Sequence, residues 1–371
     1  MSTVMHSTSS IPTEQYCGIP IRNIWLLMLY ASDLYQQAEV DQTVDAEKNP
    51  DNIPDLIAEV LSHAVEKRLR RNLTHGYQSE HAILNRVRGR IDVLQTTTHR
   101  LLSRGVVACE YQQLTMDTPR NQYVRAALEI LSRIVQRSDL KQRCHALTIS
   151  LERLGVTNRK PSRTEISTLR FGRHDKEDRF LVDAAKLAFD LTIPTRAHGN
   201  QSVHALESTD QWLRKLFEKA VGGFYKTVLS RDGWQISTGR RLHWPVIQAT
   251  DGIRDILPSM QLDIVLENFS QKRRIVVDTK FTAMLKQGKF GRDMLRSGYL
   301  YQIYAYLRSQ SGQVDPMADS AEGVLLHPAI NQRIDESIQM QDHTFRFMTV
   351  DLAASAGTFR QDLLKIVQPQ F

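Results

Sequence analysis

The stretch IVVDTK, residues 275–280, places an aspartate and a lysine at the end of an apolar, β-branched run. Such a run is typical of a buried strand. Side chains two apart on a strand point to the same side, so Asp278 and Lys280 are expected to face one place. Both could be ordinary surface charges, because an acid-x-lysine triplet occurs by chance in many proteins. The surrounding sequence decides between the two interpretations.

A second acid lies on the preceding apolar stretch. LPSMQLDIVLEN (257–268) carries Asp263 fifteen residues before Asp278, and the polar segment NFSQKRR separates the two stretches. A hairpin that turns at 269–272 would bring the two aspartates together. Two carboxylates suit a hard divalent ion such as Mg²⁺, and a nearby lysine can orient a water or offset charge on a phosphodiester. The pattern therefore favours a metal-dependent phosphodiesterase site.

Three further side chains are candidates for the same site. YLYQIYAYL (299–307) spaces Gln302 and Tyr306 four residues apart, which places them on one face of a helix. KLFEKA (215–220) places Glu218 on a helix before the strands, where its carboxylate could reach the metal ion or its waters. A lone glutamate on an amphipathic helix is usually a solvated charge, so Glu218 is the weaker candidate.

The pattern of helices and strands predicts an α+β protein. The 371 residues are enough for two or three domains. Residues 1–18 are polar and expected to be flexible, and residues 19–195 are mainly helical with a strand-like insert at 78–112. A polar segment at 196–204 marks the predicted domain boundary. Residues 205–371 alternate between helices and strands, which predicts an α/β domain with a central mixed sheet flanked by helices.

Composition narrows the classes of function. There are 48 Lys+Arg against 41 Asp+Glu, for a net charge of +7 and a pI near 9.3. This balance favours a polyanion such as nucleic acid, although a basic soluble protein is the plain alternative. Cys17, Cys109 and Cys144 form no CxxC pair, so neither a zinc knuckle nor a disulfide framework is expected.

The cysteine usage fits a reducing cytoplasm, and the N-terminus supports that location. It lacks the basic start and apolar core of a signal peptide. The apolar stretch IWLLMLYA (24–31) is far shorter than the roughly 20 residues that a membrane span needs. We therefore expect a cytoplasmic protein without membrane association, in which residues 24–31 form a buried helix.

One basic cluster in the N-terminal region has two interpretations. RVRGR (86–90) places Arg86, Arg88 and Arg90 on one face of a predicted strand. They could contact DNA or a partner, or they could keep a solvated edge strand from aggregating. Four scattered histidines lack ligand spacing and are assigned no metal role: His174, His204, His243 and His327.

Together these motifs resemble a known family. The acids, the lysine and the Gln302–Tyr306 pair resemble the PD-(D/E)xK nuclease superfamily in its QxxxY variant, although Leu262 stands where the superfamily name has a proline. Over about residues 18–367, the chain resembles the McrC family, the nuclease subunits of the McrBC modification-dependent (type IV) restriction system. The resemblance is carried by GIPIRNIWLLMLYASDLY (18–35), VRGRIDVLQT (87–96), LTMDTPRNQYVRAAL (114–128), LPSMQLDIVL (257–266), RRIVVDTKFT (273–282) and YLYQIYAYL (299–307).

The resemblance implies a role for each candidate residue. Asp263 and Asp278 are implied metal ligands, and Glu218 is the third candidate ligand from its position in the sequence. Lys280 is the implied catalytic lysine, and Mg²⁺ is the expected ion, with Mn²⁺ as an alternative. The predicted catalytic set is Glu218, Asp263, Asp278, Lys280, Gln302 and Tyr306.

The resemblance also implies partners. Residues 19–195 would engage a McrB-like AAA+ GTPase hexamer, plug its central channel and stimulate its hydrolysis. Residues 205–371 would be the endonuclease domain that cuts double-stranded DNA carrying modified cytosine. Reading of the modified base is expected on the partner.

Two other functions stay open. The chain could be a non-cutting regulatory subunit that only activates an AAA+ NTPase, but the intact set of acids and lysine argues against a relic site. It could also be a stand-alone PD-(D/E)xK repair nuclease. The N-terminal region carries no zinc finger or helix-turn-helix pattern, which favours recognition by a partner instead.

Overall fold

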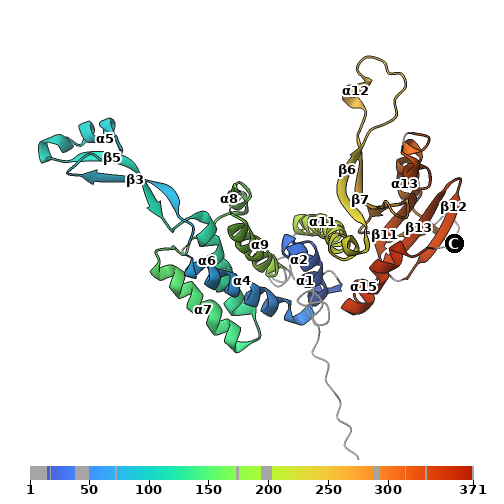
Figure 1. Ribbon diagram of the computed structural model, residues 1–371, viewed down its shortest axis with the longest axis horizontal. Helices are drawn as coiled ribbons and strands as arrows, with labels where there is room; N and C mark the ends of the chain where they lie inside the picture. The colour runs from blue at the N-terminus through green and yellow to red at the C-terminus, as the bar shows by residue number, and fades with distance from the viewer. Residues whose placement is uncertain are drawn as a thin grey trace, which may run out of the picture. The chain divides into compact units, whose positions relative to one another are not determined.

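The computed structural model describes residues 15–16, 18–37, 50–71, 73–172, 175–193, 203–287, 292–313, 315–330 and 332–369. This part of the chain forms two compact units, which we call the sheet unit and the helical unit (Figure 1). The sheet unit takes the described residues up to Ile53 and from Leu191 onward, and the helical unit takes Pro54–Asp190. The predicted flexible segment 1–18 and the predicted boundary at 196–204 fall mostly outside the described residues. None of the described helices has the length and apolarity that crossing a membrane requires.

The sheet unit is built around one mixed sheet, as the sequence predicts, and the fold class is α+β. Its strands follow in the order β12-β13-β11-β8-β7-β6. β11 runs parallel to β8 and β13, whereas β6, β7 and β8 pair antiparallel, as do β12 and β13. The six strands are β6 (Gln235–Leu242), β7 (Met260–Asn268), β8 (Arg273–Thr279), β11 (Glu322–Pro328), β12 (Asp335–Met340) and β13 (His343–Val350).

Helices and short elements complete the sheet unit. The predicted helix around Gln302 and Tyr306 is α13, and a short strand, β10, precedes it. The helices are α1 (Ile21–Tyr30), α2 (Asp33–Gln37), α11 (Val203–Val228), α12 (Ile253–Ile256), α13 (Ser297–Gln310), α14 (Pro316–Asp319) and α15 (Ala356–Leu364), with 3₁₀ turns η1 (Pro50–Asn52), η4 (Leu229–Asp232) and η5 (Lys365–Val367). The short strands are β1 (Gln15–Tyr16), β2 (Ile19–Pro20), β9 (Leu285–Gln287) and β10 (Asp293–Leu295).

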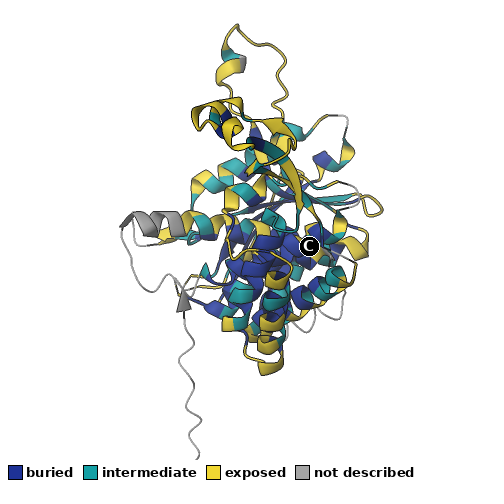
Figure 2. Ribbon diagram, turned by 90° about the vertical axis from the view of Figure 1, so that its left-hand side faces the viewer, coloured by how far each residue is buried: buried dark blue, intermediate teal, exposed yellow. Residues whose placement is uncertain are grey.

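Different helices cover the two faces of the sheet. On one face, Gly222 of α11 lies against Ile264 of β7. On the other face, Ile303 and Leu307 of α13 lie against Gly323 of β11. A strand that is covered on both faces is apolar throughout rather than alternating, which explains the unbroken IVV of β8. Figure 2 shows buried residues, in dark blue, concentrated on the packed helices, whereas the projecting loops are exposed.

Helix α1 belongs to the sheet unit, which corrects the predicted domain boundary. The stretch IWLLMLYA is helical and buried, as predicted, but it packs on α11. A Cβ added to Gly223 would overlap the Tyr30 carbonyl oxygen, so the two helix backbones meet directly. Residues 19–53 were predicted to fold with the N-terminal helices. Periodicity shows that a helix has an apolar face but not which distant element covers that face.

The helical unit carries a projecting antiparallel ribbon. Figure 1 shows β3 and β5 extending away from the helices, with α5 at the far end. β5 pairs with both β3 and β4. The elements are α4 (Ile53–Arg70), β3 (Gly76–Leu84), β4 (Arg90–Ile91), α5 (Val93–Thr98), η2 (Leu101–Arg104), β5 (Val107–Thr115), α6 (Pro119–Ile134), α7 (Ser138–Arg153), α8 (Arg163–Ser167) and α9 (Lys176–Asp190).

The RVRGR segment is not the strand that the sequence predicts. Residues 85–89 bend between β3 and β4, so Arg86, Arg88 and Arg90 do not share one strand face. The Arg88 guanidinium instead stacks over the Tyr111 ring at 4.0 Å. The alternating pattern therefore belongs to a bend, and its Arg88 side chain packs on Tyr111 of the ribbon.

The base of the ribbon is fixed to helix α6. Thr118 caps the helix by accepting from the Asn121 N–H. The Asn121 side chain donates to the carbonyl oxygens of Thr74 at 3.1 Å and Met116 at 2.8 Å. These two residues precede β3 and follow β5, so one amide joins both roots of the ribbon to the helix.

Candidate active site

Asp263 and Asp278 lie at the same end of the β7–β8 hairpin, as predicted. The antiparallel ladder pairs Ile264 with Val277, so the two aspartates are the next residues along the two strands. The hairpin turns between Asn268 and Arg273, where the polar segment was expected to turn. Two carboxylates fifteen residues apart in the sequence therefore lie together at one end of the inner strands β7 and β8.

The strands separate at Asp263. Its Oδ2 accepts hydrogen bonds from the Thr279 backbone N–H at 2.8 Å and from the Thr279 hydroxyl at 3.0 Å. Leu262 and Val265 both pack in the cluster beneath α13, so the alternation of the strand is broken between them. Opposite Asp263, Gly239 has a φ of +67° and is skipped in the β6–β7 pairing. The side chain of Asp263 thus replaces a ladder bond, which fixes its orientation.

Asp278 is a buried carboxylate without hydrogen-bond partners among the described residues. It is 1% exposed, and neither of its oxygens accepts a hydrogen bond there. The Lys280 ammonium lies 2.7 Å from Oδ2 and forms an ion pair with it. Burial raises the pKa of Asp278 to about 6; the Lys280 charge opposes this rise, and the Asp263 charge adds to it. A cation would relieve such a group.

Glu218 of α11 lies within electrostatic reach of both aspartates. Burial raises its pKa, and the charges of Asp263 and Asp278 raise it further, against the opposing charges of Lys219 and Lys280. The side chain is half-buried. Its carboxylate therefore belongs to the same electrostatic environment, although Glu218 was the weakest of the predicted candidates.

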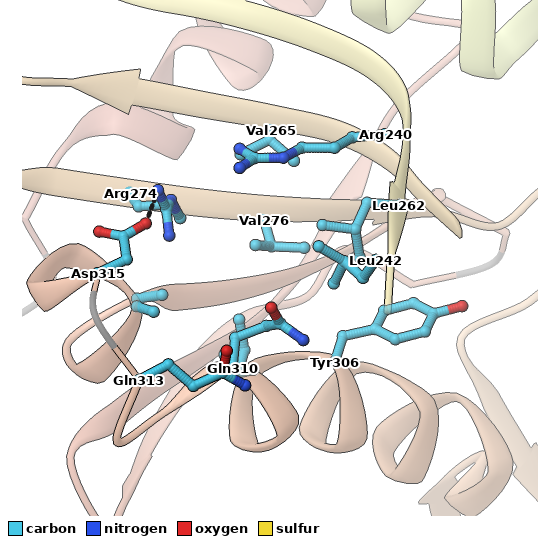
Figure 3. A pocket seen from close by; sticks show the side chains of 13 residues that line it. Arg240, Leu242, Leu262, Val265, Arg274, Val276, Tyr306, Gln310, Gln313 and Asp315 are labelled. Carbon is cyan, nitrogen blue, oxygen red and sulfur yellow. Dashed lines mark hydrogen bonds and ion pairs between the residues drawn. The ribbon is translucent and has the colours of Figure 1, made fainter. Parts of the chain in front are cut away.

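Gln302 and Tyr306 lie on α13, the helix that covers this face of the sheet. The Gln302 amide donates to the Tyr306 hydroxyl at 2.6 Å. Tyr306 lines a pocket of about 190 Å³ whose walls include Leu262, next to Asp263, and Val276, two residues before Asp278 (Figure 3). The two side chains therefore bond each other, and Tyr306 faces the same pocket as two neighbours of the acids along their strands. Among the described contacts, neither of them bonds a candidate metal ligand.

Three residues near the site were not predicted to act there. Thr279 anchors Asp263, Tyr299 of α13 holds its ring centroid 5.3 Å from the Lys280 ammonium, and His327 of β11 lies 5.7 Å from the Tyr299 ring. Only Thr279 had a signal in the sequence, as the middle residue of DTK. Tyr299 and His327 reach the site through a helix and a parallel strand that no local pattern pairs with β8.

The oxygen donors suit a hard divalent ion. Mg²⁺ is commonly held by one or two carboxylates and keeps several waters, and Asp263 and Asp278 supply two. In the described part of the chain, no three His, Cys, Asp or Glu side chains are arranged to hold a metal ion together. The arrangement therefore fits two direct ligands, and Glu218 as a third ligand stays a prediction.

Comparison with known proteins places the chain in context. A family model described as McrBC 5-methylcytosine restriction system component matches residues 6–317. The type IV methyl-directed restriction enzyme EcoKMcrBC of Escherichia coli (strain K12) is 24% identical over 350 residues, covering 94% of this chain and 97% of that protein.

Two solved assemblies from Thermococcus gammatolerans are also similar. One is a half-complex from a tetradecameric assembly of McrB AAA+ hexamers with bound McrC, at 15% identity and a TM-score of 0.44, covering 94% of this chain and 76% of that chain. The other is the McrBC complex, at 15% identity and a TM-score of 0.33, covering 49% and 60%.

Proposed function

The chain belongs to the McrBC 5-methylcytosine restriction system component family, and on this premise we propose that it is the Mg²⁺-dependent DNA endonuclease subunit of a McrBC-like complex. It would cut DNA phosphodiesters with a nuclease site of the PD-(D/E)xK type. It would also stimulate a McrB-like AAA+ GTPase hexamer. Its substrate would be double-stranded DNA with modified cytosine. The net charge of +7 is consistent with a polyanionic substrate.

One observation carries the nuclease assignment. The Asp278 carboxylate is buried at a strand end, lacks hydrogen-bond partners among the described residues, and is balanced by one lysine two residues away. A buried charge held in this way is expensive, and such groups are most often functional. A second carboxylate, Asp263, faces it from the paired strand with its orientation fixed by Thr279.

Each residue then has a role in phosphodiester hydrolysis. Bound Mg²⁺ would polarise the phosphodiester and lower the pKa of an attacking water. Asp263 and Asp278 would hold the ion, and Glu218 would orient its waters. Lys280 would leave its ion pair with Asp278 and stabilise the charge that develops on the phosphate oxygens.

The Gln302–Tyr306 pair would contact the DNA or support the site from α13. Its hydrogen bond of 2.6 Å holds the amide and the ring in fixed positions beside the acids. Fixed polar groups at the edge of a catalytic site position a substrate without the cost of ordering flexible side chains.

The ribbon of the helical unit supports a docking role. Along its length it exposes large apolar side chains, which a protein without a partner rarely leaves in water. The most exposed are Tyr77 and Leu94, each 78% exposed, followed by Leu102 at 70%, Val93 at 68% and Val87 at 59%. We assign this surface to the AAA+ partner, which leaves the sheet unit for DNA cleavage.

The test is a cleavage assay with a McrB-like AAA+ protein. Plasmid with or without methylated cytosine is incubated with Mg²⁺ and GTP, with the partner present or omitted. We expect double-strand breaks only when methylation, Mg²⁺ and partner are all present. Robust cutting by this chain alone would favour a stand-alone nuclease. Stimulated GTP hydrolysis without any break would favour a regulatory subunit.

A further inference from the structure

His327 lies beside Lys280 on the neighbouring strand. In the parallel ladder between β8 and β11, Thr279 pairs with Leu326, and the Lys280 N–H donates to the Leu326 carbonyl at 3.0 Å. His327 and Lys280 are the next residues along their strands, so alternation turns both side chains to the same face. Paired strands are about 4.8 Å apart. The imidazole and the lysine stem are therefore direct neighbours.

The tautomer of His327 is fixed by its surroundings. Its Nδ1 lies 2.8 Å from the Thr282 carbonyl oxygen, which can only accept, so Nδ1 carries the proton. Burial lowers the pKa of His327 to about 4; the Thr282 hydrogen bond opposes this, and the charges of Lys280 and Arg296 reinforce it. The ring is therefore neutral near neutral pH. Its Nε2 lone pair is buried and has no partner among the described residues.

His343 shows what a structural histidine looks like in the same unit. It is also fully buried, and its Nδ1 lies 2.8 Å from the Ala321 carbonyl oxygen. Its Nε2, however, accepts from the Ser311 hydroxyl at 2.8 Å. Buried polar atoms in native proteins are normally paired in this way. The contrast singles out Nε2 of His327 as an acceptor kept open next to the candidate site.

The Lys280 ammonium is the nearby donor that could bond to Nε2 of His327. Its ammonium lies 2.7 Å from Asp278 Oδ2 and 5.3 Å from the centroid of the Tyr299 ring. The same ring lies 5.7 Å from the ring of His327, so Tyr299 borders both groups. An ammonium paired with a metal ligand must find another acceptor when that carboxylate binds a cation, because a buried charge cannot stay unpaired.

We propose that His327 is a positioning residue for Lys280: its Nε2 accepts a hydrogen bond from the ammonium once the Asp278 carboxylate binds a divalent ion. This inference rests on the proposed nuclease function. Tyr299 borders the path of the ammonium with its ring face, which attracts cations. His327 itself touches neither DNA nor metal ion. It holds the lysine where the phosphate can meet it.

The direct test is a nitrogen spectrum of the full chain labelled with ¹⁵N-histidine. On addition of Mg²⁺, the Nε2 signal of His327 is expected to move upfield, as an acceptor nitrogen does when it gains a hydrogen bond. The Nε2 signal of His343 is already hydrogen-bonded and should stay in place. In Lys280→Met, which cannot donate, the His327 signal should no longer respond. His327→Gln assigns the resonance.

A kinetic test separates positioning from packing. His327→Leu removes the acceptor, and we expect kcat to fall roughly 10- to 100-fold, as for groups that orient a catalytic residue, with KM for DNA unchanged. His327→Gln keeps an acceptor and should recover most of the loss. Combined with Lys280→Ala, His327→Leu should cost nothing further, because the residue acts only through the lysine. His343→Leu is the matched control, and it should lower stability without lowering kcat.

The outcomes separate this inference from the proposed function. If the wild type cuts DNA and His327→Leu retains its kcat, the positioning role is overturned while the nuclease function stands. The same holds if Mg²⁺ binds and the Nε2 signal of His327 does not move. If the wild type neither binds Mg²⁺ nor cuts DNA, the nuclease function fails and the role of His327 fails with it.

Discussion

The β7–β8 hairpin and the β3–β5 ribbon are both antiparallel pairs, but only one of them is covered. β8 runs through the middle of a six-stranded sheet, and residues 275–278 are buried in succession. β3 has no buried residue and alternates between exposed and half-buried positions. A charge inside the first strand needs a partner or a ligand, whereas apolar side chains on the second find no core. The difference points to chemistry in the sheet unit and docking on the ribbon.

The largest expected effect comes from Asp278→Ala. It removes a carboxylate that the sheet buries without hydrogen-bond partners, so cleavage should fall by about 10³-fold or more, a loss on the scale of removing a key transition-state group. Stimulation of the partner's GTP hydrolysis should persist, because the ribbon is untouched. A gel assay of plasmid cleavage and a phosphate-release assay measure the two activities. Asp232→Ala, an exposed acid in the same unit, is the control and should cut normally.

The next effect tests the other side of the comparison. Replacing Leu94 and Leu102 by Ser removes two exposed apolar side chains from the far end of the ribbon. We expect partner binding to weaken by roughly 30- to 1,000-fold, since two apolar anchors at an interface contribute about 1–2 kcal/mol each. Calorimetric titration against the partner measures this. Mg²⁺ binding and thermal stability should not change.

Leu154→Ser is the control for the ribbon variant. It replaces an exposed leucine of the helical unit that lies outside the ribbon. If the ribbon variant bound the partner as tightly as the wild type does, the ribbon would not be the docking surface.

The smallest effect is on stability and depends on pH. The pKa of Asp278 is about 6 in the fold against an ordinary 3.8, so the protonated form is favoured by folding. The protonated Asp278 carboxyl therefore contributes its full stabilisation to the fold below about pH 4, and this stabilisation is lost as the pH rises through 6. Without metal, Asp278→Asn should therefore stabilise the chain at pH 7.5 by about 1–2 kcal/mol, allowing for the loss of the Lys280 pair.

Urea denaturation in EDTA at several pH values measures this difference. The gap between Asp278→Asn and wild type should be widest at pH 7.5 and should close toward pH 5. If Asp278→Asn were less stable than the wild type at pH 7.5, the fold would accommodate the charged carboxylate without a bound cation, and the argument for a metal site would fail.

Local patterns were enough to predict that Asp263 and Asp278 lie together. Apolar runs on both sides of a polar turn fix a hairpin register, and that register places Asp263 opposite Asp278. Gln302 and Tyr306 follow from helical spacing in the same way. Glu218 was only a weak candidate, because a sequence cannot show that burial and two aspartates raise the pKa of a helical carboxyl.

Long-range pairings were beyond the sequence. His327 reaches Lys280 only because β11 runs parallel beside β8, and Tyr299 does so only because α13 crosses that face. Helix α1 was assigned to the wrong unit for the same reason: its contact with Gly223 of α11 joins segments almost 200 residues apart. The bend at residues 85–89 was missed because its alternation imitates a strand.

The most direct measurement is cleavage of methylated plasmid by the wild type and by Lys280→Ala, each assembled with the AAA+ partner, GTP and Mg²⁺. Loss of the Lys280 side chain leaves both acids in place. We expect that the wild type cuts only with the partner, and that Lys280→Ala loses roughly 10²- to 10³-fold of this activity while it still stimulates GTP hydrolysis. If the two proteins cut equally well, IVVDTK is a strand with charges at its end and the catalytic site lies elsewhere.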